Sequence, residues 1–469
     1  MDQQKSTMLY GSLWKNVFLF AIPLAFTGIL QQLFNAADIA IVGQFTQERG
    51  ASAMAAVGAN APIVALLLNF FVGISLGSNV VIANAIGSNQ NGTIHSAIGT
   101  SILIALAGGI LLAIGGQWIV DPLLASLSVP SEVMDMATIY LRIYLIGMPV
   151  ILLYNFEAAI LRGAGDTKTP LFVLSISGVL NVILNLVFVI GFKLDVEGVA
   201  IATVVSNAMS SIILLIKLIR SKTIIHLDLR HLDFNRYVLV RILRIGIPAG
   251  IQSSVFSIAN VIVQGATNSL GTLVMAASSA AMNIEIFAFN VLASFGQACT
   301  TFVGQNYGAH QIARCKQILK VCLTESAMLT FASIVLILCF GKNLLSIFNG
   351  DPDVINLGYM RMMIIFPAYA FSLTYDVISG YLRGFGISLL PAFLTSLSIC
   401  GSRISWVAFV FPNFPSFQTI MMIFPISLGL AALSLIVALF IKRPASKILQ
   451  KEKKSQELEV KNNPELALE

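Results

Sequence analysis

Apolar windows of about twenty residues recur along the whole chain and constrain its fold more than any other feature. Residues 169–191, 199–218 and 421–441 are three examples, and each is long enough to cross a hydrocarbon core of about 30 Å. The 469 residues are 57% hydrophobic and only 11% charged, so polar side chains are too few to cover a core of that size in water. The sequence therefore predicts an all-α polytopic membrane protein with twelve transmembrane helices.

The distribution of Lys and Arg predicts how this protein is oriented. If the N-terminus is cytoplasmic, 22 of the 28 basic residues fall on the inner side. Five fall on the outer side: Arg49, Arg142, Lys193, Lys342 and Arg361. Cytoplasmic loops carry the excess of basic residues, so we expect a plasma-membrane protein with both termini in the cytoplasm. The basic C-terminal tail then reads as a topology signal with some attraction to membrane lipid, and nucleic-acid binding is not expected.

The chain carries an internal duplication. The phrase "LRGAGDTKTP" at residues 161–170 returns as "LRGFGISLLP" at residues 382–391, and Pro23 aligns with Pro248 in a second repeated stretch. The matching stretches occur in the same order in both halves of the chain, at offsets of 221 to 225 residues, which indicates two copies of one unit. Six helices per copy return the chain to its starting side, so the copies form two parallel-repeat six-helix bundles.

A charged segment between the copies marks the domain boundary. The predicted division is an N-terminal tail (1–15), an N-lobe (16–218), a cytoplasmic bridge (219–240), a C-lobe (241–441) and a C-terminal tail (442–469). Each copy of the repeated phrase is interpreted as a cytoplasmic elbow between the fourth and fifth helices of its lobe, where glycines allow a tight turn. A phosphate-binding loop is excluded, because no strand precedes the glycines.

An acidic residue lies inside the first apolar window. Thr27, Gln31, Asn35 and Asp38 recur at spacings of four, four and three, which places them on one helix face. An Asp at the centre of a membrane helix costs about 2.5–3.5 kcal/mol, so it is a functional candidate by default. The alternative is a carboxylate near the outer interface that water reaches and that couples to nothing.

Further polar residues in the first half accompany Asp38. Asn155, Asn181, Asn185 and Thr203 carry oxygens that can coordinate Na⁺ or hydrogen-bond a carboxyl that gains and loses a proton. Hydrogen bonding between helices explains the asparagines equally well.

The second half keeps the polar stripe but loses its acid, because Val263 occupies the register of Asp38. Glu285 and Asp376 are candidates for a second protonatable site or for attracting cationic substrates. Arg403 needs a partner inside the membrane, and we expect Asp376 or Glu285, in a pair that is structural or functional. Glu157 and Glu325 are interpreted as satisfied carboxylates near the cytoplasmic interface.

Aromatic residues share these helices and suit flat cations through cation–π attraction, although helix packing explains them as well. The predicted substrate cavity comprises Gln31, Phe34, Asn35, Asn260, Gln264, Glu285, Asp376 and Arg403.

Four stretches together resemble one transporter family. They are "LFNAADIAIVGQF", "LRGAGDTKTP", "EGVAIATVVSN" and "FVGQNYGA", and the chain resembles the multidrug and toxic compound extrusion (MATE) family from about Lys15 to Arg443. The resemblance implies two six-helix bundles around a central cleft, and export of organic cations or other amphipathic compounds driven by inward H⁺ or Na⁺. It also implies a cation site in the first lobe, which Asp38, Asn181 and Thr203 match. Asn185 stands where several relatives have Asp, which leaves the ion open.

Other function classes fit less well. His95, His226, His231 and His310 fall in predicted loops, no HExxH motif occurs, and the five cysteines lack CxxC spacing, so neither an enzyme nor a metal site is expected. No cofactor is expected beyond the coupling ion, and the protein is expected to be a monomer. A lipid-linked oligosaccharide flippase remains the alternative; its cavity should carry several cationic residues, and only Arg403 falls within a predicted span.

Overall fold

The computed structural model describes residues 8–46, 50–126, 129–229 and 232–450, which are helical almost throughout. The first half contains α1 (Leu13–Phe45), α2 (Gly50–Gly87), α3 (Asn91–Ser126), α4 (Ser131–Ile146), α5 (Met148–Gly163), α6 (Lys168–Leu186) with a π-helical end η2 (Val187–Gly191), and α7 (Val196–Ile219). The second half contains α8 (Arg236–Asn268), α9 (Thr272–Gly308), α10 (Ile312–Ser346), α11 (Pro352–Gly384), α12 (Leu389–Thr395), η3 (Ser396–Gly401), α13 (Ser402–Ser405), η4 (Trp406–Val410) and α14 (Phe417–Lys442).

Twelve spans follow from these helices. Within the described residues, eleven helical segments are long and apolar enough to cross a membrane, and the pair α4–α5 supplies the twelfth. That pair bends by 51° at Gly147, and Pro149, in the first turn of α5, has no amide donor. Large apolar side chains such as Trp118 and Phe331 are 79% and 69% exposed, as expected of surfaces that face lipid.

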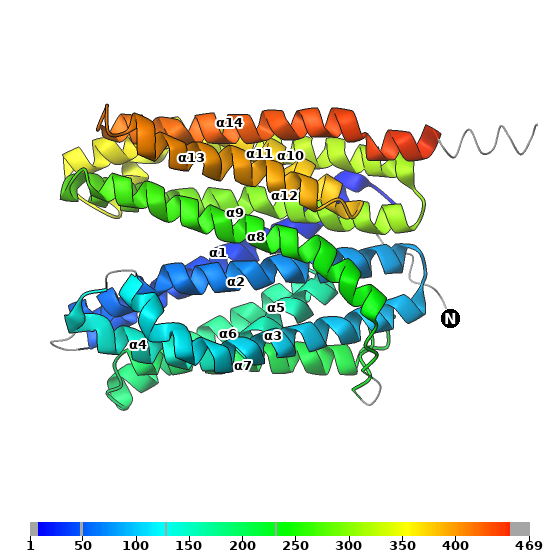
Figure 1. Cartoon of the computed structure of the whole chain (residues 1–469), viewed down its shortest axis with the longest axis horizontal. Coiled ribbons are helices and arrows are strands. Elements are labelled where there is room, and N and C mark those ends of the chain that lie inside the picture. Colours follow the sequence, from blue (N-terminus) through cyan, green and yellow to red (C-terminus); the bar gives the residue numbers. More distant parts are fainter. Residues whose placement is uncertain (1–7, 47–49, 127–128, 230–231, 451–469) are drawn as a thin grey trace, which may run out of the picture.

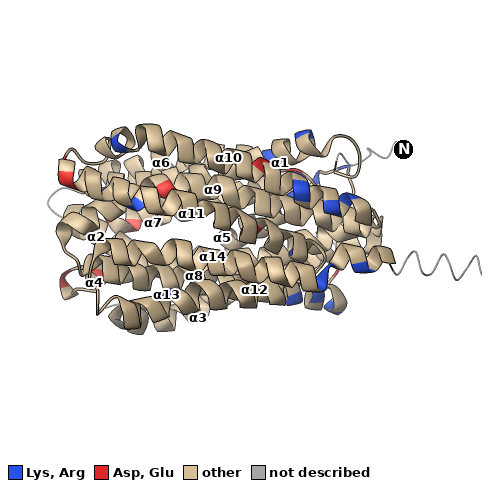
Figure 2. Ribbon diagram, turned by 90° about the horizontal axis from the view of Figure 1, so that it is seen from above, with Lys and Arg blue, Asp and Glu red and all other residues tan. Residues whose placement is uncertain are grey.

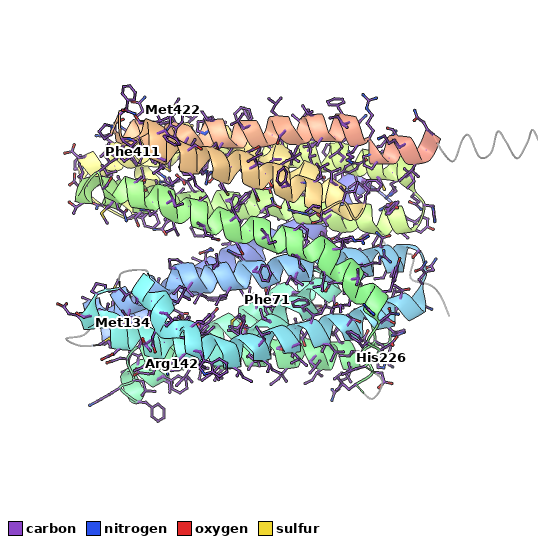
Figure 3. All side chains as sticks on the ribbon, viewed as in Figure 1. Phe71, Met134, Arg142, His226, Phe411 and Met422 are labelled. Carbon is purple, nitrogen blue, oxygen red and sulfur yellow. The ribbon has the colours of Figure 1, made fainter. Side chains whose placement is uncertain are left out.

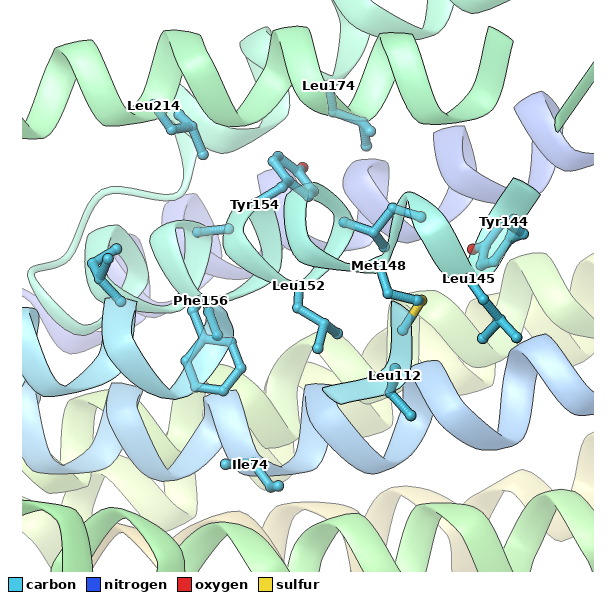
Figure 4. Packing of buried hydrophobic residues seen from close by; sticks show 14 of the residues in the cluster. Ile74, Leu112, Tyr144, Leu145, Met148, Leu152, Tyr154, Phe156, Leu174 and Leu214 are labelled. Atoms are coloured by element: carbon cyan, nitrogen blue, oxygen red, sulfur yellow. The ribbon is translucent and has the colours of Figure 1, made fainter. Parts of the chain in front are cut away.

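The helices form two lobes, with α1–α7 in one and α8–α14 in the other (Figure 1). Figure 4 shows part of the apolar cluster of the N-lobe, including Met148, Leu152 and Phe156. The first helix of each half crosses between the lobes. Apolar residues 13–24 of α1 pack in the C-lobe cluster, while Val238 and Ile242 of α8 pack in the N-lobe cluster. Each lobe thus begins with a helix that is partly held by the other.

The duplication extends to backbone conformation. Gly165 and Gly386 occupy the same position in the two copies of the repeated phrase, with φ of 97° and 80°. Asn89 and His310, which the repeat also aligns, have φ of 52° and 57°. Left-handed conformations are uncommon outside glycine, so equal turns at aligned positions indicate one inherited unit.

Charge distinguishes the two ends of the molecule. Most Lys and Arg lie at the end where the N-terminal trace emerges (Figure 2), and we call this the basic end. Figure 3 places His226, in the connection between α7 and α8, at the basic end, and Met134, Phe411 and Met422 at the opposite end. α8 begins at Arg236, inside the predicted bridge 219–240.

The lobes meet in the half of the molecule toward the basic end. A Cβ on Gly73 of α2 would lie 2.3 Å from the Cα of Gly250 in α8, so these helices touch through their backbones. Thr301 of α9 donates to Asn79 of α2 at 3.0 Å, and Gln305 donates to the carbonyl of Gly163 at 2.8 Å. Toward the opposite end, the C-lobe has an apolar cluster of its own, to which no described N-lobe residue belongs. The molecule is therefore closed at its basic end.

Candidate functional site

Three helices of the N-lobe place polar side chains around Asp38. The Asp38 carboxylate on α1 is 7% exposed. Its Oδ1 accepts from Asn185 Nδ2 of α6 at 2.5 Å, and its Oδ2 accepts from Thr203 Oγ1 of α7 at 3.2 Å. An acid from the first helix thus meets an amide and a hydroxyl from the fifth and sixth spans.

Asn181 completes this group, one helical turn before Asn185 on the same face of α6. Its Oδ1 accepts from Asn185 Nδ2 at 3.3 Å, and its Nδ2 lies 3.5 Å from Thr203 Oγ1. Asn185 is fully buried, and its Oδ1 has no partner within the described residues. We call Asp38, Asn181, Asn185 and Thr203 the Asp38 cluster.

The Asp38 carboxylate is surrounded by neutral groups. Among the residues that the structure describes, no Lys or Arg forms an ion pair with it. A buried charge without a counter-ion is unfavourable, so the site favours either a proton on Asp38 or a bound cation. An amide side chain suits both states, because it donates to a carboxylate through NH₂ and accepts from a protonated carboxyl through its oxygen.

Asn155 is not joined to this cluster by a hydrogen bond; its side chain donates to the Ile151 carbonyl of its own helix at 2.8 Å. The structure also places a stacked pair of tyrosines of α4, Tyr140 and Tyr144, in the buried interior of the same lobe, with ring centroids 6.2 Å apart. Sequence reasoning missed both tyrosines. Their spacing of four places them on one helix face, which was the available signal.

In the C-lobe, Glu285 is paired with Arg361 rather than with Arg403. Arg361 donates to both Glu285 oxygens at 2.8 Å and to Ser278 at 2.7 Å. Glu285 and Arg361 are 6% and 4% exposed as whole residues. Arg361, counted above among the basic residues of the outer side, lies within α11 and is buried. It lies inside the bundle, because a carboxylate from α9 compensates its charge there.

Within the described residues Arg403 has no carboxylate partner, so the expectation of Asp376 or Glu285 is wrong. It donates to Asn260 at 2.6 Å and to Ser427 at 3.3 Å. Its guanidinium lies 4.5 Å from the centre of the Phe424 ring, whose attraction for a cation replaces an ion pair.

A cavity of about 180 Å³ lies between the lobes, in the half toward the basic end. We call it the inter-lobe cavity. Its walls come from both lobes: Leu24, Val72, Gly73, Ser75, Leu76, Asn79, Arg162, Ala249, Ser253, Ala293, Gly296, Gln297, Thr300, Thr301, Asp376 and Arg383.

Of the eight residues predicted to form the substrate cavity, Asp376 alone lines the inter-lobe cavity. Phe34 packs against α6, where a Cβ on Gly178 would lie 1.8 Å from its ring. Gln264 donates to Asn268 at 2.8 Å, and Gln31 and Asn35 are exposed. The polar stripe of α1 therefore separates into a buried acid and exposed amides.

The elbow arginines lie elsewhere than expected. The repeated phrase is predicted to be a cytoplasmic elbow, but its two arginines, Arg162 and Arg383, occupy the last turn of a helix and line the inter-lobe cavity. The missed signal was that arginine is retained in both copies while the other charges of the phrase are lost.

Two further acids are more buried than expected. Glu157 is fully buried, and neither of its carboxyl oxygens has a hydrogen-bond partner within the described residues. Glu325 is 6% exposed, and its Oε2 also has none. Their interpretation as satisfied interface carboxylates is wrong, because neighbouring helices cover both positions.

Comparison with known proteins identifies the family. The MatE family model matches residues 23–187 and 248–409, one segment in each half. The chain is 28% identical over 414 residues to the "Probable multidrug resistance protein YoeA" of Bacillus subtilis, covering 87% of this chain and 89% of that protein. It is also 28% identical over 415 residues to the "Probable multidrug resistance protein NorM" of Thermotoga maritima, covering 84% and 85%.

A solved structure has the same fold. A crystal structure of MATE in complex with MaL6 superposes with a TM-score of 0.86 at 21% identity, covering 96% of this chain and all of that one. The polytopic fold, the duplicated halves and the matched segments agree in indicating a transporter and not an enzyme. The chain therefore belongs to the MatE family of multidrug and toxic compound extrusion transporters.

Proposed function

We propose that this protein is a secondary active antiporter that exports organic cations or other amphipathic compounds in exchange for H⁺ or Na⁺. The observation that carries the proposal is the Asp38 cluster, in which a buried carboxylate accepts hydrogen bonds only from neutral groups of the described residues. Such a carboxylate changes its charge state when it takes up an ion, whereas one paired with arginine stays charged. The names of the relatives support drug export.

We infer that the coupling ion is H⁺. A fixed cage for a hard cation needs several oxygen ligands, and Asn185 replaces what would be a second carboxylate. A proton needs one acceptor, and the unpartnered Asn185 Oδ1 can accept from a protonated Asp38 once the amide turns over.

Transport then proceeds by alternating access between two lobe arrangements. The structure is closed at the basic end, and Asp38 lies in the part of α1 toward the opposite end. Ion binding at Asp38 and substrate binding between the lobes are linked if each favours a different arrangement.

Replacing Asp38 by Asn tests the proposal. D38N keeps size and hydrogen bonding but removes the change of charge, so we expect ion-driven efflux of ethidium from proteoliposomes to be abolished. D353N, at an exposed aspartate in the first turn of α11, is the matched control and should retain efflux. Imposing pH and Na⁺ gradients separately on the wild type identifies the ion. Normal gradient-driven efflux by D38N would remove Asp38 from the mechanism.

The flippase alternative has one observation in its favour. Arg403 is not the only arginine inside the bundle, because Arg162 and Arg383 line the inter-lobe cavity. If the wild type exports no organic cation under either gradient, the flippase becomes the better assignment.

A further inference from the structure

Two arginines that the duplication relates line the inter-lobe cavity from opposite lobes. Arg162 lies in the last turn of α5 in the N-lobe, and Arg383 lies in the last turn of α11 in the C-lobe, each within the sequence Leu-Arg-Gly. The one other ionisable residue in the lining is Asp376. The cavity therefore carries one more positive than negative charge, contributed by both halves.

The hydrogen-bonding capacity of these arginines is largely unused. Arg383 donates to Gln252 through Nη2, while its Nε has no partner within the described residues. In the same part of the chain, Arg162 forms neither a hydrogen bond nor an ion pair, and Asp376 Oδ2 is also without a partner. A guanidinium presents five donors in a fork that matches carboxylate and phosphate oxygens. Both side chains are only partly buried, so their free donors are open to an acceptor that enters the cavity.

Contacts within the folded protein do not compensate the charges of Arg162 and Arg383. Glu157, one turn and a half before Arg162, does not compensate it, since both Glu157 oxygens are unpartnered. Asp376 forms no ion pair with Arg383. The two buried arginines of the described residues are satisfied within the protein, Arg361 by Glu285 and Arg403 by Asn260 and Phe424. Arg162 and Arg383 differ from them in facing a cavity.

We propose that the inter-lobe cavity binds the anionic group of an amphipathic substrate, a carboxylate or a phosphate, between Arg162 and Arg383. The inference rests on the proposed export function and specifies the substrate class, since transported compounds would include zwitterions and anions beside simple cations. Ser75, Asn79 and Thr300 offer further polar contacts in the lining, and Leu24 and Leu76 offer apolar ones. A volume of about 180 Å³ suits the charged end of a drug-sized molecule. A bound anion would bridge the two lobes.

Two dyes that differ in one carboxylate test this proposal. Rhodamine B carries a carboxylate beside its cationic ring system, and rhodamine B ethyl ester lacks that negative charge. Binding of each to the purified full-length protein in detergent, followed by fluorescence polarisation without any gradient, measures the preference directly. We expect the wild type to bind rhodamine B more tightly than its ester.

The variants have expected effects of opposite sign. R162Q and R383Q should each weaken rhodamine B binding about tenfold or more, because a charged hydrogen bond is lost, and leave ester binding within about twofold. R162K should retain part of the affinity, and D376N should increase it by removing a like charge. R142Q, at an exposed ion pair with Asp121, is the control and should change neither affinity. The opposite effects of R383Q and D376N are not expected from misfolding.

Three outcomes would overturn the inference. Equal wild-type affinity for both dyes, or an equal loss of both in R162Q and R383Q, would show that the carboxylate is not recognised. The third outcome concerns lipid. If short-chain phosphatidylglycerol competes far more strongly than phosphatidylcholine of the same chain length, and this competition is lost in R383Q, the cavity binds lipid headgroups instead. The binding assay needs no ion gradient. If the protein still prefers rhodamine B but shows no efflux, the antiport proposal is contradicted and the anion site is not.

Discussion

Two buried carboxylates, Asp38 and Glu285, show how neighbouring residues separate a functional acid from a structural one. They are 7% and 6% exposed, so burial does not distinguish them. Glu285 accepts two charged hydrogen bonds from Arg361, whereas Asp38 accepts one from an amide and one from a hydroxyl. The ion pair therefore gives Glu285 a counter-charge, while Asp38 has none among the described residues and can bind an ion.

Replacing one partner of the Glu285–Arg361 pair should destabilise the protein far more than replacing both partners together. E285L or R361L leaves one buried charge uncompensated, so we expect each to lower the free energy of unfolding by about 3–5 kcal/mol. The double variant should lose much less than the sum. SDS titration in mixed micelles measures the three values. Additive losses would show that the two residues act independently.

At the scale of helices, close contact between α2 and α8 closes the basic end. Glycines make this approach possible, since a Cβ on Gly250 would lie 2.4 Å from the Phe70 carbonyl and one on Gly77 would lie 2.3 Å from the Ile242 carbonyl. Small residues at crossing points let membrane helices approach through their backbones. The α2–α8 contact is thus an element that a lobe movement must open.

Adding one methyl group to this contact should shift the lobes apart at the basic end. In G250A the new Cβ meets backbone, which cannot move aside, so the closed arrangement is disfavoured. Spin labels at Asn91, the first residue of α3, and at Gln317, in the second turn of α10, report the separation by pulsed electron resonance, and we expect longer distances. G265A on the same helix adds its methyl in open space and is the control. Unchanged distances in G250A would exclude this contact as a determinant of closure.

For the whole molecule, the basic end sets the expected orientation. It contains the start of α1, the connection between α7 and α8 and the end of α14, and the basic side chains gather there (Figure 2). Basic segments are retained on the cytoplasmic side during insertion. In this orientation the structure, which is closed at its basic end, would be an outward-facing arrangement of the lobes.

Cysteine labelling in intact cells checks this orientation. In a background with the exposed Cys339 replaced by Ser, H226C should react with a membrane-impermeant maleimide only after permeabilisation, because residue 226 is exposed at the basic end. S269C, exposed in the turn between α8 and α9, should react without it. The reverse pattern would place the basic end outside.

The sequence alone determined the architecture. It also determined which members of the Asp38 cluster lie side by side on one helix, because that depends only on local spacing. Apolar length sets each span, an even number of spans per copy makes the repeats parallel, and a spacing of four places Asn181 beside Asn185. These properties depend on residues close in the chain, so they can be inferred before the helices are packed.

Only the tertiary structure decided which partners the buried charges have. Arg361 and Glu285 are 76 residues apart, and Arg403 and Asn260 are 143 apart. Arg162 and Arg383 face one cavity because two lobes close over them. An apolar window does not encode how its helix is rotated or which helices adjoin it; that follows from backbone contacts such as Gly73 with Gly250. The physical reason is that lipid satisfies any apolar face equally, so close packing between helices selects one arrangement.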